Sequence, residues 1–141
     1  MTSPAVSAQA TGSISRSVSV LLYSDDRAIR DQVRLAIGSQ PAEDVTITSW
    51  TECATPDAVL QEMQRAGSHD VLILDGEARP YGGMGLCRQL KSEIFQCPPV
   101  LVLTGRPGDG WLATWSLADA FLSRPLDEAR LTAAVADLAR R

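Results

Sequence analysis

Short apolar runs alternate with amphipathic segments along the chain from residue 18 onward. Apolar runs of strand length occur at 18–23, 45–50, 70–75, 98–105 and 119–125. Segments with a helical spacing of apolar residues follow at 26–38, 55–67, 84–95, 108–118 and 126–141. Strands that are apolar along most of their length are typical of a parallel sheet covered by helices on both faces. The pattern predicts an α/β fold in which a five-stranded parallel sheet is doubly wound by helices.

The beginning of the chain does not share this pattern. Residues 1–17 are rich in Ser, Thr, Ala and Gly and have no periodicity, which predicts a flexible N-terminal tail. Residues 18–141 have the length of one domain and contain no linker long enough to separate a second one. We therefore expect a single domain without an output domain.

Composition narrows the classes of partner. The 141 residues carry a net charge of −4, which argues against a nucleic-acid surface because such a surface needs a basic patch. No apolar run approaches the ~20 residues of a membrane span. The N-terminus also lacks the basic start and apolar stretch of a secretory signal. These features predict a cytoplasmic protein without direct membrane insertion.

Polar side chains stand where the predicted strands end. In chain order they are Asp25, Asp26, Asp75, Thr104 and Arg124. The carboxyl ends of parallel strands meet at one edge of a sheet, where sites form. Converging carboxylates repel each other unless a pKa rises or a cation binds, and hard oxygen ligands suit Mg²⁺. A carboxylate, a metal, a hydroxyl and a basic group around one point would serve phosphoryl transfer to Asp75.

This ordered set resembles the receiver domain, the response-regulator module of two-component signalling. Its elements are an acidic cluster after the first strand, Asp75 after the third, Thr104 after the fourth and Arg124-Pro125 after the fifth. The resemblance covers residues 18–141 and implies a flavodoxin-like (βα)5 fold with strand order 2-1-3-4-5. It also implies a phosphoprotein of a phosphorelay, which receives its phosphoryl group from a histidine kinase and is not itself an enzyme.

Carried over residue by residue, the resemblance implies that Asp75 is the phosphoacceptor. The Mg²⁺ ligands would be Asp25, Asp75 and the backbone carbonyl of Glu77, with Asp26 as a further candidate.

The resemblance also assigns residues that respond to the phosphoryl group. Thr104 and Arg124 would contact it, and Phe121 would change rotamer on activation. Trp111 and Trp115 are four residues apart in the predicted helix 108–118, so they lie on one helix face. In receivers this region is a usual partner surface, and large exposed aromatics there would be hot spots.

Three positions depart from the family. Ser24 stands where the family has the first acid of its pair, and a metal site with fewer charges binds more weakly. Arg124 replaces the family lysine, and its planar fork is not a conservative change at a close contact. Arg79 replaces the usual proline, which is displaced by one residue to Pro80.

Two functions follow from these features. One is a phosphorylation switch in which Asp75 with Mg²⁺ controls contact with a protein partner. The alternative is a phosphorylation-independent pseudo-receiver that serves as an accessory or regulatory subunit of a larger assembly. A third class, an enzyme of flavodoxin-like or hydrolase type, is disfavoured because the acidic segment YSDDR after the first strand would repel a phosphate.

One further resemblance suggests a partner. The sequence is similar to stand-alone receiver-like proteins of high-GC Gram-positive bacteria that are encoded near the proton-pumping NADH:quinone oxidoreductase. This resemblance implies respiratory complex I as a partner, with the protein at the cytoplasmic side of that membrane complex.

Overall fold

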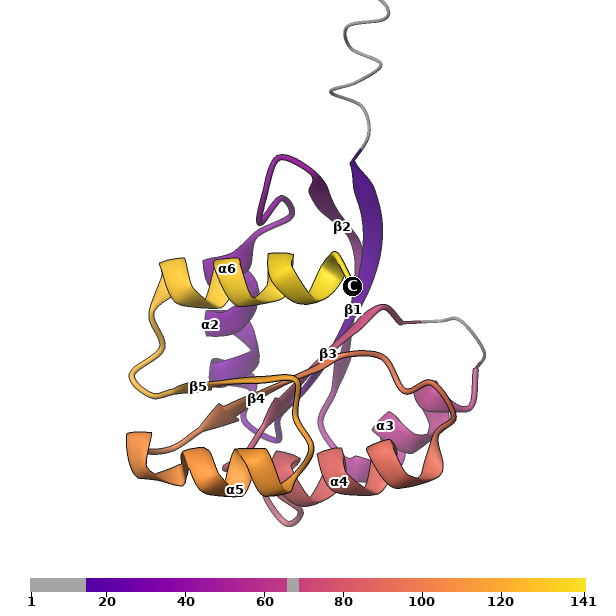
Figure 1. Cartoon of the computed structure of the whole chain (residues 1–141), viewed down its shortest axis with the longest axis vertical. Coiled ribbons are helices and arrows are strands. Elements are labelled where there is room, and N and C mark those ends of the chain that lie inside the picture. The colour runs from indigo at the N-terminus through magenta and orange to yellow at the C-terminus, as the bar shows by residue number, and fades with distance from the viewer. Residues whose placement is uncertain (1–14, 66–68) are drawn as a thin grey trace, which may run out of the picture.

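Five parallel strands run through the middle of the molecule (Figure 1). The structure is a computed structural model, and it describes residues 15–65 and 69–141. The strands are β1 (Arg16–Tyr23), β2 (Val45–Cys53), β3 (Val71–Asp75), β4 (Val100–Thr104) and β5 (Ala120–Ser123). They pair in the order β2-β1-β3-β4-β5, all in parallel. The predicted fold class and strand order are confirmed.

Helices cover both faces of the sheet. They are α2 (Arg27–Ile37), α3 (Pro56–Met63), α4 (Gly83–Glu93), α5 (Gly110–Trp115) and α6 (Glu128–Ala139), with the 3₁₀ turn η1 (Pro107–Asp109) before α5. Figure 1 shows α2 and α6 on one side of the sheet and α3, α4 and α5 on the other. Three helices begin at a residue whose side chain accepts a backbone N–H of the first turn, namely Asp26, Thr55 and Asp127.

Alternation along the strands divides the core into two layers. Val20 and Leu22 of β1 belong to the layer under α2 and α6, whereas Leu21 and Tyr23 belong to the layer under α3 and α4. All four are fully buried. Successive side chains of a strand point to opposite faces, so a strand covered on both faces must be apolar at every position. This requirement explains the uninterrupted apolar runs in the sequence.

The elements differ from the predicted bounds at several ends. β1 begins at Arg16 rather than Val18, so the predicted tail is too long by two residues: Arg16 and Ser17 pair with Val45 and Thr46. Of the remaining tail, Ser15 is described and residues 1–14 are not. The predicted helix end at Gly67 also lies outside the described residues, but α3 itself ends earlier, at Met63. β2 extends to Cys53 because β1 offers it partners as far as Tyr23. No helix in the described part of the chain is long and apolar enough to cross a membrane.

Asp119 joins three elements at the edge of the sheet away from the strand carboxyl ends. Its carboxylate accepts hydrogen bonds from Lys91 Nζ (2.6 Å), the Val100 N–H (2.8 Å) and Arg141 (2.9 Å). Burial by itself would raise the pKa of Asp119, but the bonds from Lys91 and Val100 outweigh burial and lower this pKa. A carboxyl whose pKa is lower in the folded state stabilises the fold above its unfolded-state pKa of about 4. That contribution is lost as the pH falls through the folded-state pKa.

We predict that Asp119→Asn lowers the free energy of unfolding by about 1 kcal/mol at neutral pH, because it removes a charge from three hydrogen bonds. The difference from wild type should shrink as the pH falls below about 4. Urea unfolding at a series of pH values measures this, with the exposed Glu43→Gln as control. A difference that stays constant down to strongly acidic pH would contradict the assignment.

Candidate functional site

The carboxylate of Asp75 is buried and each of its oxygens is hydrogen bonded. Asp75 is the last residue of β3, and 2% of its surface is exposed. Its Oδ1 accepts from Arg124 Nη2 (2.8 Å) and from the Glu77 N–H (2.9 Å). Its Oδ2 accepts from Ser24 Oγ (2.7 Å). The donors come from the ends of β1 and β5 and from the loop after β3 itself, so the predicted convergence at this sheet edge is confirmed.

Arg124 is the cation of this site. Its backbone N–H donates to the Thr104 carbonyl (3.0 Å), which places the residue directly after β5 beside the end of β4. Its guanidinium forms an ion pair with Asp75, and the side chain is only 30% exposed. Charge-assisted bonds of this kind are roughly twice as strong as neutral ones.

Ser24 is fully buried and its hydroxyl connects two acids. Besides donating to Asp75, Ser24 Oγ accepts the N–H of Asp26 (3.1 Å). In the sequence, Ser24 is notable only because the family has an acid at this position. The structure gives it a role of its own, as the hydrogen-bond donor to Oδ2 of Asp75.

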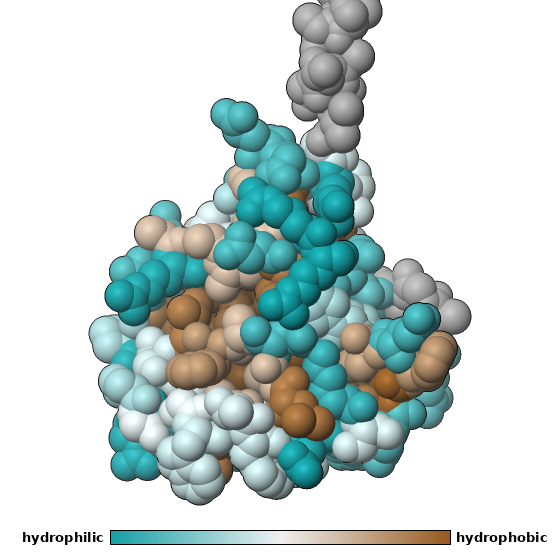
Figure 2. Space-filling model, in the orientation of Figure 1, coloured by the Kyte–Doolittle hydropathy of each residue, from teal (hydrophilic) through white to brown (hydrophobic). Residues whose placement is uncertain are grey.

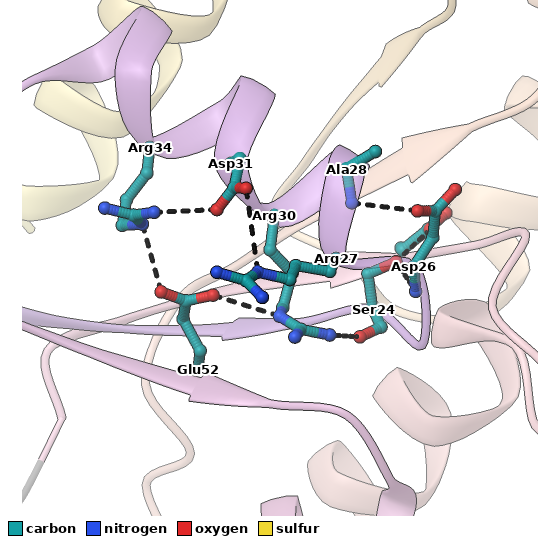
Figure 3. A network of polar contacts seen from close by, with 9 residues as sticks. Ser24, Asp26, Arg27, Ala28, Arg30, Asp31, Arg34 and Glu52 are labelled. Carbon is teal, nitrogen blue, oxygen red and sulfur yellow. Dashed lines mark hydrogen bonds and ion pairs between the residues drawn. The ribbon is translucent and has the colours of Figure 1, made fainter.

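An ion-pair network holds the segment around Ser24 in place (Figure 3). Arg30 of α2 donates to the Ser24 carbonyl (2.7 Å) and also pairs with Glu52 of β2 (3.0 Å). Glu52 in turn pairs with Arg34, which pairs with Asp31. These contacts tie the β1–α2 loop to both the helix and the edge strand. Sequence reasoning missed Arg30 and Glu52, which belong to different elements far apart in the chain.

The two acids that follow Ser24 are both engaged, and in different ways. Asp26 Oδ1 accepts the Ala28 N–H (2.9 Å) and so caps α2. Asp25 Oδ1 accepts the Arg79 N–H (3.1 Å), which links this loop to the loop after β3. A small cavity at the sheet edge is lined by Asp25, Asp26, Ile29, Asp75, Glu77, Arg79 and Arg124. The predicted acids therefore share one site, but each has a backbone or side-chain partner.

The local field at this edge is negative. Burial raises the pKa of the Tyr23 hydroxyl, and the negative charges of Asp25 and Asp75 raise it further. Tyr23 precedes Ser24, and its hydroxyl donates to the Tyr81 carbonyl.

The donor set does not fit a magnesium ion. Mg²⁺ demands near-octahedral oxygen ligation, and its affinity rises with the number of charged ligands. At this edge Ser24 is neutral, Asp26 caps a helix and Asp75 is paired with Arg124. Within residues 15–65 and 69–141 no cluster of three or more His, Cys, Asp or Glu side chains is arranged to hold a metal.

The predicted responding residues are Thr104, the last residue of β4, and Phe121, which lies in β5. The Thr104 hydroxyl is buried, 3.0 Å from Ser123 Oγ and 3.4 Å from the carbonyls of Arg106 and Leu122. None of the hydrogen bonds of the described residues joins Thr104 to Asp75. The ring of Phe121 is 42% exposed and lies against α5, since a Cβ added at Gly110 would be 3.0 Å from its Cζ.

Both tryptophans of α5 are exposed. Trp111 is 70% and Trp115 48% exposed, and the guanidinium of Arg88 lies 4.7 Å from the centroid of a Trp115 ring. The inward residue of α5 is Ala113, which is fully buried. Both tryptophans are therefore accessible on the surface, and their role in partner contact stays a prediction.

Known proteins of similar sequence are named as regulatory proteins. A response regulatory protein of Mycobacterium tuberculosis, named as uncharacterized, is 45% identical over 126 residues, which cover 89% of this chain and 94% of that protein. The transcriptional regulatory protein CseB of Streptomyces avermitilis is 30% identical over 86% of this chain, but the match spans 49% of CseB. No family model matches the chain.

Solved structures of similar fold are receiver domains and response regulators. A response regulator from Chloroflexus aurantiacus superposes with a TM-score of 0.74 at 19% identity and covers 89% of this chain and 100% of its own. The receiver domain of a Francisella response regulator has a TM-score of 0.72 at 19% identity, over 88% and 98% of the two chains. At this identity the likeness concerns the fold alone.

We predict that Ser24→Ala lowers the free energy of unfolding by about 2 kcal/mol, because it leaves a buried carboxylate oxygen without a donor. The matched control is Ser92→Ala on the exposed face of α4, where the hydroxyl bonds only a helix carbonyl and the change should stay within about 0.5 kcal/mol. Denaturant unfolding compares the two. Equal values for both variants would show that the bond from Ser24 to Asp75 does not stabilise the site.

Proposed function

Because the chain belongs to the response regulators and has the receiver fold, we propose that it regulates a larger protein assembly by direct contact, without phosphorylation of Asp75 controlling that contact. The observation that carries the proposal is the hydrogen-bonded state of Asp75. Its two carboxylate oxygens together accept three hydrogen bonds, and its surface is almost entirely buried. The proposal gives the domain no catalytic reaction of its own.

Phosphoryl transfer needs a different arrangement from the one around Asp75. A carboxylate oxygen must reach the phosphorus atom, and a metal or cation must neutralise the charge of the moving group. In this site Ser24 engages Oδ2, while Arg124 and the Glu77 N–H engage Oδ1. Attack by Oδ1 would require one of its two bonds to break, and attack by Oδ2 would have to use the lone pair beside the bond from Ser24. The arrangement supports a carboxylate with a structural role.

The surface proposed for the contact lies around α5 and β5. Its apolar residues are Trp111, Trp115, Leu117 and Phe121, each at least 42% exposed. Figure 2 shows hydrophobic residues gathered between α6 and α5, over β5. A groove there is lined by Pro107, Phe121, Leu122, Ser123, Pro125, Asp127 and Arg130. Phe121 lines this groove, and exposed aromatic side chains are usual anchors of a protein interface.

The proposed partner is a membrane-bound or membrane-associated protein complex reached from the cytoplasm. The similarity of the sequence to receiver-like proteins encoded near NADH:quinone oxidoreductase makes respiratory complex I the first partner to test. Contact through the receiver-like domain itself is the proposed mode of action.

A phosphorylation switch is the rival function. It is supported by the positions of Asp75, Thr104 and Arg124 at the ends of β3, β4 and β5. In that case a histidine kinase would be a partner, and Asp75 would be the phosphoacceptor with Mg²⁺ bound. The two functions differ in what Asp75→Asn does to partner binding.

We predict that tagged wild type and Asp75→Asn recover the same large complex from native, mildly solubilised extract in equal yield. Trp111→Ser should reduce recovery at least tenfold, because it removes an exposed aromatic anchor. Leu35→Ser, which removes a 79% exposed apolar side chain from α2 on the other side of the sheet, is the matched control. Thermal unfolding of each variant verifies that it is folded.

Two results would contradict the proposal. Loss or gain of the complex with folded Asp75→Asn alone would favour the phosphorylation switch. Equal loss with Trp111→Ser and Leu35→Ser would remove the proposed surface.

A further inference from the structure

We infer that Arg124 is a built-in counter-cation for Asp75 and that, together with Ser24, it makes this site independent of divalent metal. The inference concerns the site of the proposed function and rests on its claim that Asp75 has a structural role. It concerns ion binding, which the recovery of a partner complex from extract does not test. Receiver domains generally bind Mg²⁺ here, so the inference predicts a measurable departure from the family.

The charges of the described side chains are the first support for a site that does not depend on a divalent metal. Asp75 and Asp25 are the two acids of the cavity whose side chains link separate loops and strand ends, and one guanidinium already neutralises Asp75. A carboxylate at position 24, added to Asp25, Asp26, Asp75 and Glu77 of the cavity, would stand at hydrogen-bond distance from Asp75, where Ser24 Oγ is 2.7 Å from Oδ2. Two carboxylates this close repel each other. Serine replaces that repulsion with a hydrogen bond, so the site no longer requires a divalent cation.

The available oxygen atoms support it second. Asp75 Oδ1 accepts from two donors and Oδ2 from one, and Asp25 Oδ1 accepts the Arg79 N–H. Both lone pairs of Asp75 Oδ1 are engaged, so a metal ion could bind Asp75 only by displacing a donor from Oδ1 or by sharing Oδ2 with the Ser24 hydroxyl. Mg²⁺ also gives up its own water reluctantly. The exchange would replace bonds already formed within the fold by bonds to a poorly ligated ion.

The position of Arg124 supports it third. The residue is anchored through its backbone N–H to Thr104, and its Nε is buried without a hydrogen-bond partner among the described residues. A guanidinium held this way cannot move into water without leaving Asp75 unpaired. Removing one partner of a buried ion pair is strongly destabilising, so the pair between Arg124 and Asp75 is retained.

The test compares wild type with Ser24→Asp, which restores a carboxylate, and with Ser24→Asn, a neutral control of the same shape. Each is unfolded thermally in millimolar MgCl₂ and in NaCl of equal ionic strength. The unfolding midpoint of wild type should be the same in MgCl₂ as in NaCl, and so should that of Ser24→Asn. Ser24→Asp should have a lower midpoint in NaCl, and MgCl₂ should raise it by about 3 °C or more because bound ligand stabilises the folded state.

A magnesium-specific rise of the wild-type midpoint would overturn the inference, and so would a Ser24→Asp variant that folds but does not respond to MgCl₂. If Ser24→Asp does not fold, binding of Mn²⁺ to wild type decides the question. Mn²⁺ prefers the same oxygen ligands, and its electron paramagnetic resonance signal falls when the ion is bound. An undiminished signal with wild type supports the inference, and a saturable loss that Mg²⁺ reverses overturns it. Either metal result leaves the contact proposal standing if Asp75→Asn still recovers the partner.

Discussion

The ion pair between Arg124 and Asp75 is the interaction on which the candidate site depends. A carboxylate that is 2% exposed must have partners, because an unpaired buried charge costs several kcal/mol. The sheet provides these partners by ending β1 and β5 at the same edge as β3. Arg124 reaches one oxygen of Asp75 and Ser24 the other. The fold thus gives both oxygens of Asp75 a hydrogen-bond partner from the chain itself.

The same arrangement separates the site from the proposed contact surface. Thr104 bonds to Ser123 and lies beside two carbonyls instead of bonding Asp75, and the Phe121 ring packs beside Gly110 at the start of α5. With Thr104 and Phe121 held in this way, the tryptophans of α5 are exposed and Asp75 is buried. A regulator that acts by contact needs only this one arrangement, whereas a switch needs two of comparable free energy.

Much of the fold and part of the site could be predicted from the sequence. The apolar runs predict the strands, because a strand buried on both faces has no polar positions. The ends of those strands predict that Asp25, Asp75, Thr104 and Arg124 lie at one edge of the sheet. The helix cap at Asp26 was also within reach, since an Asp before a helical repeat is a usual N-cap.

Other features depend on tertiary contacts that no local pattern contains. The hydroxyl of Ser24 bonds a residue 51 positions away, and Arg30 binds Glu52 across two elements. The start of β1 at Arg16 follows from pairing with Val45 and from the bond between the Arg16 guanidinium and the Ala139 carbonyl. Residues 15–17 have no apolar periodicity of their own, so pairing decided their conformation.

The most direct test of the account is an NMR titration of the wild-type protein with beryllofluoride and Mg²⁺, which together mimic a phosphorylated aspartate. The account predicts that the resonances of Thr104, Glu77 and Phe121 do not move, because Arg124 and Ser24 keep the Asp75 carboxylate engaged. A saturable shift of these resonances would show that Asp75 accepts a phosphoryl-like group with a metal ion, and it would contradict the account.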